Sequence, residues 1–263
     1  METLKSLIQN KIPNTSTANG CKKSYIDAMN VIQGGLRGYN CDKCKNKGII
    51  YYEKDGYEYF HDCECMTVRR SIARIERSGL KNALEKCTFE NYEVTEQFQQ
   101  YIKAKASDYL SDFRNWFYIG GQVGCGKTHI CTAIVGELLN QGKAARYMQW
   151  RDDVVRIKSN ANTDDYSKLI EPFKCAEVLY IDDLFKTEKD KTPTTADINI
   201  AFEILNHRYI NQNLITIISS EKTIEEIINI DEAVGSRIYE MSKKYCICIK
   251  PDRNKNYRLR GAL

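Results

Sequence analysis

Two stretches of the chain bring together residue types that bind phosphate and a divalent cation. The first, "GGQVGCGKTH", runs from Gly120 to His129 and follows the apolar run "WFYI". Residues 121–128 fit the pattern G-x-x-x-x-G-K-T between a strand candidate and a helix candidate. Glycines let the backbone turn its N–H groups inward, and the following helix adds its positive end. The residues expected to contact a nucleotide are Gly121, Gln122, Val123, Gly124, Cys125, Gly126, Lys127, Thr128 and His129.

Lys127 and Thr128 have separate expected roles in this loop. The Lys127 ammonium can reach the β and γ phosphates, and the Thr128 hydroxyl can bind Mg²⁺. The alternative is a glycine-rich turn before an ordinary helix. The order of strand, loop and helix favours phosphate binding.

The second stretch, "EVLYIDDLF", supplies two adjacent carboxylates. Four apolar residues run into Asp182 and Asp183, which places both at the end of a buried strand. We expect Asp182 to hold Mg²⁺ and Asp183 to orient or deprotonate an attacking water. Paired carboxylates suit hydrolysis better than phosphorylation of a bound metabolite. The alternative is an Asp-Asp turn after a buried strand.

Two further polar positions follow along the chain. The strand candidate "LITIISSE" ends in Ser219, Ser220 and Glu221, and we assign Ser220 to contact with the γ-phosphate or the water. A strand-ending turn is the alternative. Arg237 lies in the helical pattern "DEAVGSRIYEMSKKY", where taken alone it is typical of a surface or ion-pairing residue.

Four of the 11 cysteines lie at the two ends of "CDKCKNKGIIYYEKDGYEYFHDCEC". Cys41 and Cys44 form C-x-x-C, and Cys63 and Cys65 form C-x-C. Strand-like runs on either side of "KDG" predict a hairpin that brings the pairs together. Four thiolates suit a tetrahedral structural Zn²⁺, which would supply much of the folding energy of so small a module. His61 as a substitute ligand, an iron–sulfur cluster and unliganded cysteines are the alternatives.

The rest of the chain predicts an α/β fold. The strand candidates "WFYIGG", "ARYMQW", "EVLYIDD", "LITIISS" and "CICIK" alternate with helical patterns from about residue 95, which favours a parallel sheet covered on both faces. We predict an amino-terminal region at 1–65 with its zinc module at 37–65, a basic helical linker at 66–94 and an ATPase domain at 95–263.

Bulk composition adds only weak limits. The chain has 263 residues and a formal charge of +4, which permits contact with nucleic acid without demanding it. Its start has no apolar signal region, and no run of about eighteen apolar residues exists to span a bilayer. We therefore expect a cytoplasmic protein whose thiols stay reduced.

Together these residues resemble the AAA+ helicase loaders of bacterial and phage replication, the DnaC/DnaI type. The resemblance rests on "GGQVGCGKTH", "VLYIDD", "TIISSE", "GSRI" and "NYRLRGAL", with the cysteine block, an Arg-rich helix and "CTFENYE" ahead of them. It covers most of the chain from about residue 37 onward. It implies a P-loop ATPase with a five-stranded parallel sheet in the order 5-1-4-3-2.

The resemblance further implies a nucleotide bound between subunits, with Arg237 reaching the ATP of a neighbouring copy. Residues 1–65 would dock on a hexameric helicase. The family's DNA-contacting helices correspond to about residues 151–174, where positive charge lies beside an aromatic ring; a solvated helical face is the alternative. The residues concerned are Trp150, Arg151, Arg156 and Lys158.

Two departures from the family stand out. Ser-Ser-Glu stands where many members carry an Asn or Thr, and little sequence follows the last strand, so hardly any room is left for a helical lid. Arg258 or Arg260 would be the replacement for a lid arginine, and neither is assigned that role.

The leading hypothesis is a loader that hydrolyses ATP with Mg²⁺, contains Zn²⁺, binds single-stranded DNA, assembles with itself when ATP is bound and delivers a hexameric replicative helicase onto DNA. An ATP-dependent transposition helper of the IstB type is the alternative within the superfamily. A zinc-containing DNA-binding adaptor that uses ATP only as a switch is the alternative outside enzymes.

Overall fold

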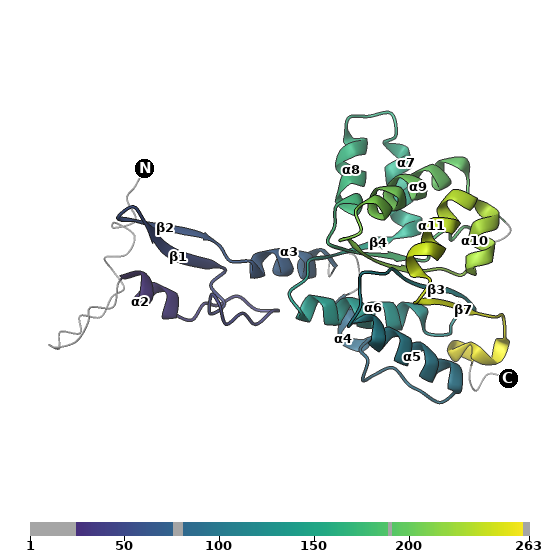
Figure 1. Cartoon of the computed structure of the whole chain (residues 1–263), viewed down its shortest axis with the longest axis horizontal. Coiled ribbons are helices and arrows are strands. Elements are labelled where there is room, and N and C mark those ends of the chain that lie inside the picture. The colour runs from purple at the N-terminus through teal and green to yellow at the C-terminus, as the bar shows by residue number, and fades with distance from the viewer. Residues whose placement is uncertain (1–24, 76–80, 189–190, 260–263) are drawn as a thin grey trace. The chain divides into compact units, whose positions relative to one another are not determined.

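The structure is a computed structural model that describes residues 25–75, 81–188 and 191–259 (Figure 1). The described residues form two compact units. One comprises residues 25–36 and 41–63, and the other comprises residues 37–40 together with the described part of 64–259. In the described part of the chain, no helix has the length and apolar character needed to cross a membrane.

The first unit is built on a β-hairpin. β1 (Ile49–Lys54) pairs antiparallel with β2 (Tyr57–Asp62), with Lys54 opposite Tyr57 at the closed end. Asp55 and Gly56 both adopt positive φ, 53° and 78°, as a two-residue hairpin turn that follows the strand twist requires. The hairpin predicted from "KDG" and its flanking runs is therefore confirmed.

A short helix, α2 (Tyr25–Val31), is fastened to this hairpin by side chains. The Asn30 amide donates to the Tyr51 carbonyl at 2.8 Å and accepts from the Tyr51 N–H at 3.0 Å, which occupies the outer edge of β1 as a neighbouring strand would. Lys47 donates to the carbonyls of Met29, Asn30 and Ile32 at 2.7–3.1 Å. A cation at this end of a helix satisfies carbonyls that lack intrahelical partners.

The second unit contains a five-stranded parallel sheet. The strands in spatial order are β4 (Ala145–Gln149), β5 (Val178–Asp182), β6 (Ile215–Ser219), β3 (Phe117–Gly121) and β7 (Cys246–Ile249). All four pairings are parallel. Numbered along the chain, this order is 2-3-4-1-5, which is the predicted 5-1-4-3-2 counted from the other edge. The predicted fold class is confirmed.

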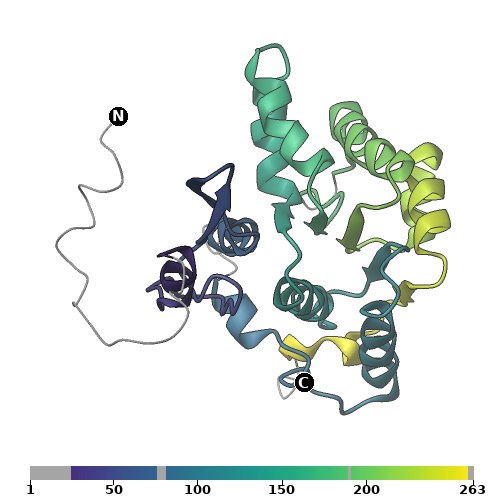
Figure 2. The ribbon, with the colours of Figure 1, turned by 60° about the vertical axis from the view of Figure 1, so that its left-hand side comes forward.

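Helices cover both faces of this sheet, as Figures 1 and 2 show. One face packs against α3 (Cys65–Ile75), α4 (Lys81–Lys86), α5 (Gln97–Tyr109) and α6 (Lys127–Asn140). The other packs against α7 (Trp150–Ser159), α8 (Asp165–Lys174), α9 (Thr195–Ile210), α10 (Ile224–Ile230) and α11 (Glu232–Ser242). Every residue of β3, β5 and β6 is buried, as expected for central strands covered on two sides.

The segment expected to be a basic linker contributes to this packing. Val68 of α3 is buried in the core on the α6 side of the sheet, and Ile72 packs against that core. Leu84 of α4 packs against it as well. The Arg69 guanidinium donates to the Arg37 carbonyl at 2.7 Å. These contacts make the helices part of the second unit.

Arg208 on α9 is a fully buried cation at the start of β5 and β6. It donates to the carbonyls of Phe173, Lys174, Ala176 and Ile215, and to the Thr216 hydroxyl. Burial lowers the pKa of Arg208 to about 9, which still leaves the guanidinium charged at neutral pH. It therefore ties the end of α8 to the starts of two strands.

Candidate nucleotide and metal sites

The glycine loop after β3 has the backbone that its sequence predicts. Gly121, Gly124 and Gly126 have φ of 102°, 75° and 93°, a region that side chains disfavour. A Cβ on Gly121 would lie 2.1 Å from the Ile249 carbonyl oxygen, and one on Gly124 would lie 2.0 Å from Asn256 Oδ1. Conformation favours glycine at both positions, and at Gly121 the Ile249 backbone also leaves no space for a Cβ.

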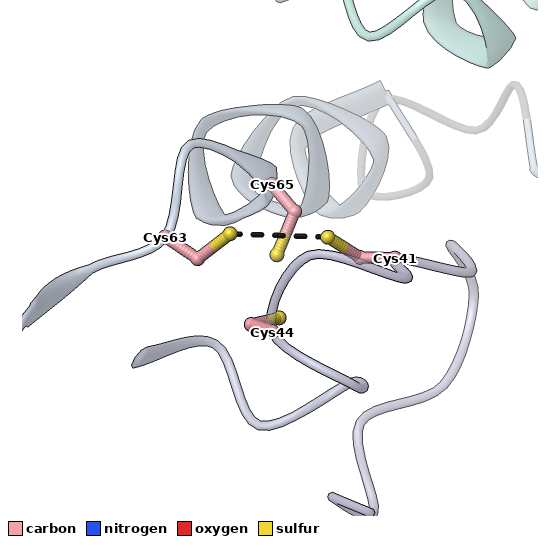
Figure 3. A group of neighbouring side chains, drawn as sticks. All are labelled: Cys41, Cys44, Cys63 and Cys65. Atoms are coloured by element: carbon pink, nitrogen blue, oxygen red, sulfur yellow. Dashed lines mark hydrogen bonds between the residues drawn. The ribbon is translucent and has the colours of Figure 1, made fainter. Parts of the chain in front are cut away.

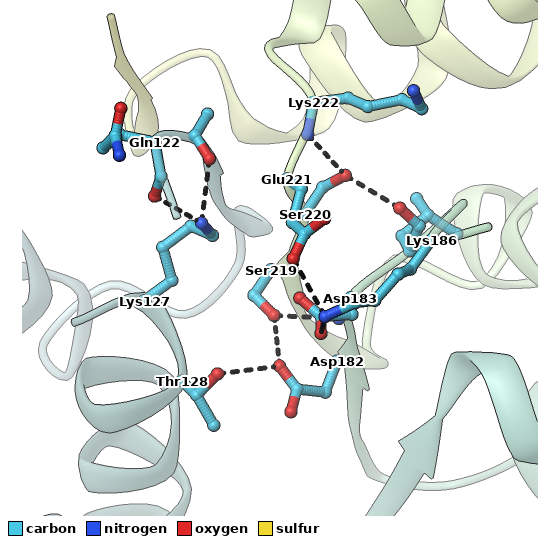
Figure 4. Close-up of polar contacts among 12 residues, drawn as sticks. Gln122, Lys127, Thr128, Asp182, Asp183, Lys186, Ser219, Ser220, Glu221 and Lys222 are labelled. Atoms are coloured by element: carbon cyan, nitrogen blue, oxygen red, sulfur yellow. Dashed lines mark hydrogen bonds and ion pairs between the residues drawn. The ribbon is translucent and has the colours of Figure 1, made fainter. Parts of the chain in front are cut away.

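Lys127 begins α6 and is buried at the mouth of the loop. Its Nζ donates to the carbonyl oxygens of Gly121 at 2.8 Å and of Gln122 at 2.7 Å (Figure 4). These carbonyls hold the Lys127 ammonium group beside the glycine loop. A phosphate oxygen bound in the loop could accept a hydrogen bond from the same group.

Asp182 lies across from this helix and is surrounded by hydroxyl groups. Its Oδ1 accepts from Thr128 at 3.3 Å, from Tyr180 at 2.7 Å and from Ser219, and its Oδ2 accepts from Tyr147 at 2.9 Å. Burial, followed by the charge of Asp182, raises the pKa of Tyr147, which keeps this hydroxyl a donor. Asp182 and Thr128, the two expected Mg²⁺ ligands, are therefore in contact.

Asp183 leaves the strand in a left-handed conformation, with φ of 58°. Its N–H donates to the Ser219 hydroxyl at 3.1 Å, and its carboxylate pairs with Lys186 at 2.7 Å. Lys186 also pairs with Glu221 at 2.9 Å. Burial by itself lowers the pKa of Lys186, but the hydrogen bonds to Asp183 and Glu221 outweigh it and leave that pKa raised.

Ser220 does not face this group of side chains. Its buried hydroxyl donates to the Leu184 carbonyl at 2.8 Å and accepts from the Lys222 N–H at 3.1 Å. The contact predicted for Ser220 is corrected accordingly: Ser219 touches both aspartates, and Glu221 reaches the cavity described next.

A cavity of about 420 Å³ opens over the glycine loop. Residues 123–129 line it together with Asp183, Lys186 and Glu221. The segments at 87–93 and 255–258 supply Cys87, Asn91, Tyr92, Glu93, Lys255, Tyr257 and Arg258. A volume of this size suits a small-molecule ligand. The cavity therefore brings the expected phosphate-binding residues together with Thr128 and Asp183, and Asp182 adjoins it through its contact with Thr128.

Three other expected contact residues flank the loop. The Gln122 side chain accepts from the Asp252 N–H at 2.7 Å, and the Cys125 thiol donates to the Gln122 carbonyl at 3.0 Å. His129 lies 2.9 Å from the Thr88 carbonyl and meets the Tyr92 ring edge to face. The Tyr92 hydroxyl is buried and has no hydrogen-bond partner among the described residues.

Arg237 lies on α11 and is not among the described residues that line this cavity. Its Nε donates to Asn206 at 3.1 Å, and its guanidinium lies over the rings of Phe202 and Tyr209 at 5.0 and 5.4 Å. Within its own chain it is a half-buried residue held by aromatic neighbours.

Trp150 is not available to stack on a nucleic-acid base. It is 2% exposed and meets Phe185 edge to face in the core. Lys158 pairs with Asp197 at 2.7 Å, and Arg151 lies 3.8 Å from Glu188. The expectation of positive charge beside an exposed ring is therefore wrong for this residue, because α7 turns Trp150, Val154 and Ile157 inward.

Four cysteine sulfur atoms converge in the described residues, all within 4.8 Å of one another (Figure 3). The sulfur atoms of Cys41 and Cys63 are 3.8 Å apart, and the Gly48 N–H donates to the sulfur of Cys44 at 3.3 Å. Tetrahedral Zn²⁺ with Zn–S bonds of about 2.3 Å places its ligands about 3.8 Å apart, so the donor set and its spacing fit this ion. His61 is exposed and lies outside the cluster, with its ring nitrogen 2.9 Å from the Asp62 carbonyl.

Several residues around the sites were missed from the sequence. Tyr180 precedes Asp182 by two residues on the same face of β5, so strand periodicity was an available signal. Lys186 pairs with Asp183 three residues before it, so its place in the sequence was also an available signal. Tyr147 and the segment at 255–258 reach the site through tertiary packing, for which no local pattern exists.

The comparisons with known proteins agree with this geometry. A family model described as "IstB-like ATP binding protein" matches residues 62–260. The phage-like element PBSX protein XkdC of Bacillus subtilis (strain 168) is 32% identical over 85% of this chain and 87% of its own length. The replicative helicase loader DnaC of Escherichia coli (strain K12) is 31% identical over 41% of this chain and 46% of its own.

Among solved structures, a crystal structure of the DnaC helicase loader aligns with a TM-score of 0.52 at 18% identity, covering 63% of this chain and 97% of that one. This likeness shows the AAA+ fold. The family match spans the glycine loop, the aspartate pair and the sheet that positions them. The chain belongs to the IstB-like family of ATP-binding proteins.

Proposed function

We propose that this protein is an ATP-hydrolysing helicase loader, which binds single-stranded DNA and delivers a hexameric replicative helicase onto it. The observation that carries the ATPase part is the contact of Thr128 with Asp182, at the edge of the cavity that Thr128 lines together with Lys127 and Asp183. The loader part is supported by the similarity to the replicative helicase loader DnaC.

The residues of the cavity fit a magnesium nucleotide. The glycine loop leaves no space for a side chain at Gly121, its glycines adopt positive φ, and Lys127 brings a cation to it. Thr128 and Asp182 would hold Mg²⁺, which when bound neutralises phosphate charge. The buried Tyr92 hydroxyl offers a polar contact to the remainder of the nucleotide.

The hydrolytic role falls to Asp183. Its left-handed backbone and the bond from its N–H to Ser219 direct the carboxylate toward Lys186 and the cavity. A carboxylate at this position orients a water molecule or accepts its proton. Arg237, held outside its own chain's cavity, is proposed to reach the nucleotide of a neighbouring copy, where an arginine stabilises developing negative charge.

The four cysteines are proposed to hold a structural Zn²⁺ in the amino-terminal region, which would contact the helicase. Four thiolates leave no open position for catalysis, so the ion would act by holding the loop at Cys41 and Cys44 against Cys63 and Cys65. The amino-terminal region at 1–65 and the ATPase domain are then separate contributors to partner binding and to ATP use.

ATP turnover with and without single-stranded DNA tests the ATPase proposal. Asp183→Asn should bind ATP as the wild type does and lose at least about 100-fold in turnover, since general-base contributions are of that order. Lys127→Ala should lose nucleotide binding itself. Equal turnover in wild type and Asp183→Asn would reject the hydrolytic role and favour an adaptor that uses ATP as a switch.

A transposition helper is the second candidate, because the matching family is described as IstB-like. Capture by the full-length protein of a purified replicative helicase, compared with a purified transposase, separates the two. Retention of the helicase in the presence of ATP supports the loader. Retention of the transposase and not the helicase would favour the transposition helper over the loader.

A further inference from the structure

The carboxyl-terminal residues 252–259 form one wall of the nucleotide cavity. They contain two short 3₁₀ turns, η2 (Arg253–Lys255) and η3 (Tyr257–Leu259). The Asp252 N–H donates to Gln122 Oε1 at 2.7 Å, and the Tyr257 N–H donates to the Gly124 carbonyl at 2.9 Å. The segment is therefore bonded to the glycine loop at two points.

The same segment is joined to the opposite wall. The Tyr257 hydroxyl donates to Glu93 Oε2 at 2.9 Å, and both residues line the cavity. Glu93 follows the buried Tyr92, whose ring lies 3.0 Å from the space that a Cβ on Gly126 would fill. One exposed hydrogen bond thus links two walls that are 164 residues apart along the chain.

The segment also brings positive charge to the cavity. Lys255 and Arg258 both line it, as does Lys127. Lys255 lies 3.8 Å from Asp252 of its own segment, whereas Lys186 is paired more closely with Asp183 and Glu221. A polyphosphate is the part of a nucleotide that attracts such cations, and arginine and lysine are its usual protein partners.

We propose that residues 252–259 are a strap over the bound nucleotide, with the Tyr257–Glu93 hydrogen bond as its clasp and with Lys255 and Arg258 as contacts to the polyphosphate. The proposal rests on the nucleotide site of the proposed function, but not on hydrolysis or on any helicase. Its consequence is kinetic: nucleotide leaves only when the clasp opens, so the clasp sets the dissociation rate.

The test is the dissociation of a fluorescent ADP analogue (mant-ADP) from the full-length protein, followed by stopped flow with excess ADP as the chase. Tyr257→Phe removes one hydroxyl and keeps the ring, and Glu93→Gln removes the charge. Each should raise the dissociation rate about 3- to 10-fold, as expected for one exposed hydrogen bond to a charged group. Tyr239→Phe, on an exposed tyrosine of α11, is the matched control and should change nothing.

The double variant gives a sharper readout. Because the two residues make one bond, Tyr257→Phe with Glu93→Gln should dissociate no faster than the faster single variant. Multiplying effects, or unchanged rates in both single variants, would overturn the clasp. A wild-type protein that binds no mant-ADP would instead refute the proposed nucleotide site, which keeps the two failures distinct.

The phosphate contacts are tested by comparing ligands of different charge. Arg258→Gln and Lys255→Gln should weaken ATP binding about 5- to 10-fold each, and AMP binding less than about 2-fold, since AMP lacks the outer phosphates. Equal losses for ATP and AMP would show that the side chains only hold the segment in place, and would overturn this part of the proposal.

Discussion

Ser219, at the end of β6, donates its hydroxyl proton to Asp182 at the end of β5 and accepts the N–H of Asp183. One small side chain therefore positions both acidic residues of the site. The loop that follows Asp183 is held to the same strand by the Leu184 N–H, which donates to the Ser219 carbonyl at 2.9 Å.

Replacing Ser219 by Ala should reduce ATP turnover about tenfold, because about 1.4 kcal/mol of positioning is lost with two hydrogen bonds. The loss should appear in kcat, with little change in the affinity for nucleotide measured without Mg²⁺. Ser220→Ala is the neighbouring control, since its hydroxyl serves the Leu184 carbonyl. A larger loss of turnover in Ser220→Ala than in Ser219→Ala would contradict the arrangement.

Purified protein should contain about one Zn²⁺ per chain, as a four-thiolate site holds one ion. Cys41→Ser should lower that content several-fold and make the amino-terminal region sensitive to protease, while ATP binding stays as in wild type. Cys175→Ser, at an exposed cysteine outside the cluster, is the control. Metal analysis and limited proteolysis are the measurements, and metal-free wild-type protein would refute the zinc assignment.

Replacing Arg208 by Met should lower the free energy of unfolding by about 3 kcal/mol, because buried carbonyls lose their charged donor. The Phe173, Lys174 and Ile215 carbonyls are among those left without it. Arg208→Lys should lose less, since it keeps the charge and some donors. Urea unfolding followed by circular dichroism measures both, and equal stability of the Met variant and wild type would contradict the role described.

Cys248 should react with iodoacetamide faster than the other exposed thiols near neutral pH. A hydrogen bond from Cys246 lowers the pKa of Cys248 to about 7, against the opposing effect of burial. A lowered thiol pKa means that the thiolate forms as pH rises through about 7, so the labelling rate should rise there and level off above it. Cys246→Ala removes the donor and should move the midpoint upward, toward the ordinary thiol value of about 8.5. Peptide mass spectrometry across pH 6–10 is the measurement, and an unmoved midpoint would rule out this cause.

The parts of the site that could be predicted from the sequence are those that depend on residues close together in the chain. The glycine loop needs its residue types within one turn, and Asp182 ends a strand whose apolar run is visible in the sequence. The sheet order came from the family resemblance, and the parallel pairings agree with it. The cysteine cluster followed from spacing alone, because a hairpin joins its two pairs.

The parts that sequence did not predict depend on register and on strand faces. Tyr147 reaches Asp182 because it pairs with Tyr180 across β4 and β5, a register that no local pattern encodes. Ser219 and Ser220 are the same residue type, so the sequence cannot tell which of them faces the aspartates. In the structure Ser219 donates to Asp182, whereas Ser220 donates to the Leu184 carbonyl. Trp150 was a different kind of error, since its spacing to Val154 and Ile157 already indicated an inward helical face.

The Asn30 amide that satisfies both main-chain groups of Tyr51 has a consequence for how the amino-terminal hairpin meets other molecules. An edge strand with unpaired main-chain groups can pair with a strand of another molecule, which is also a route to aggregation. In this hairpin the Asn30 side chain already occupies the N–H and carbonyl of Tyr51 on the edge of β1. A partner strand therefore cannot pair with the main chain at Tyr51, and contacts at this point of the hairpin are left to side chains.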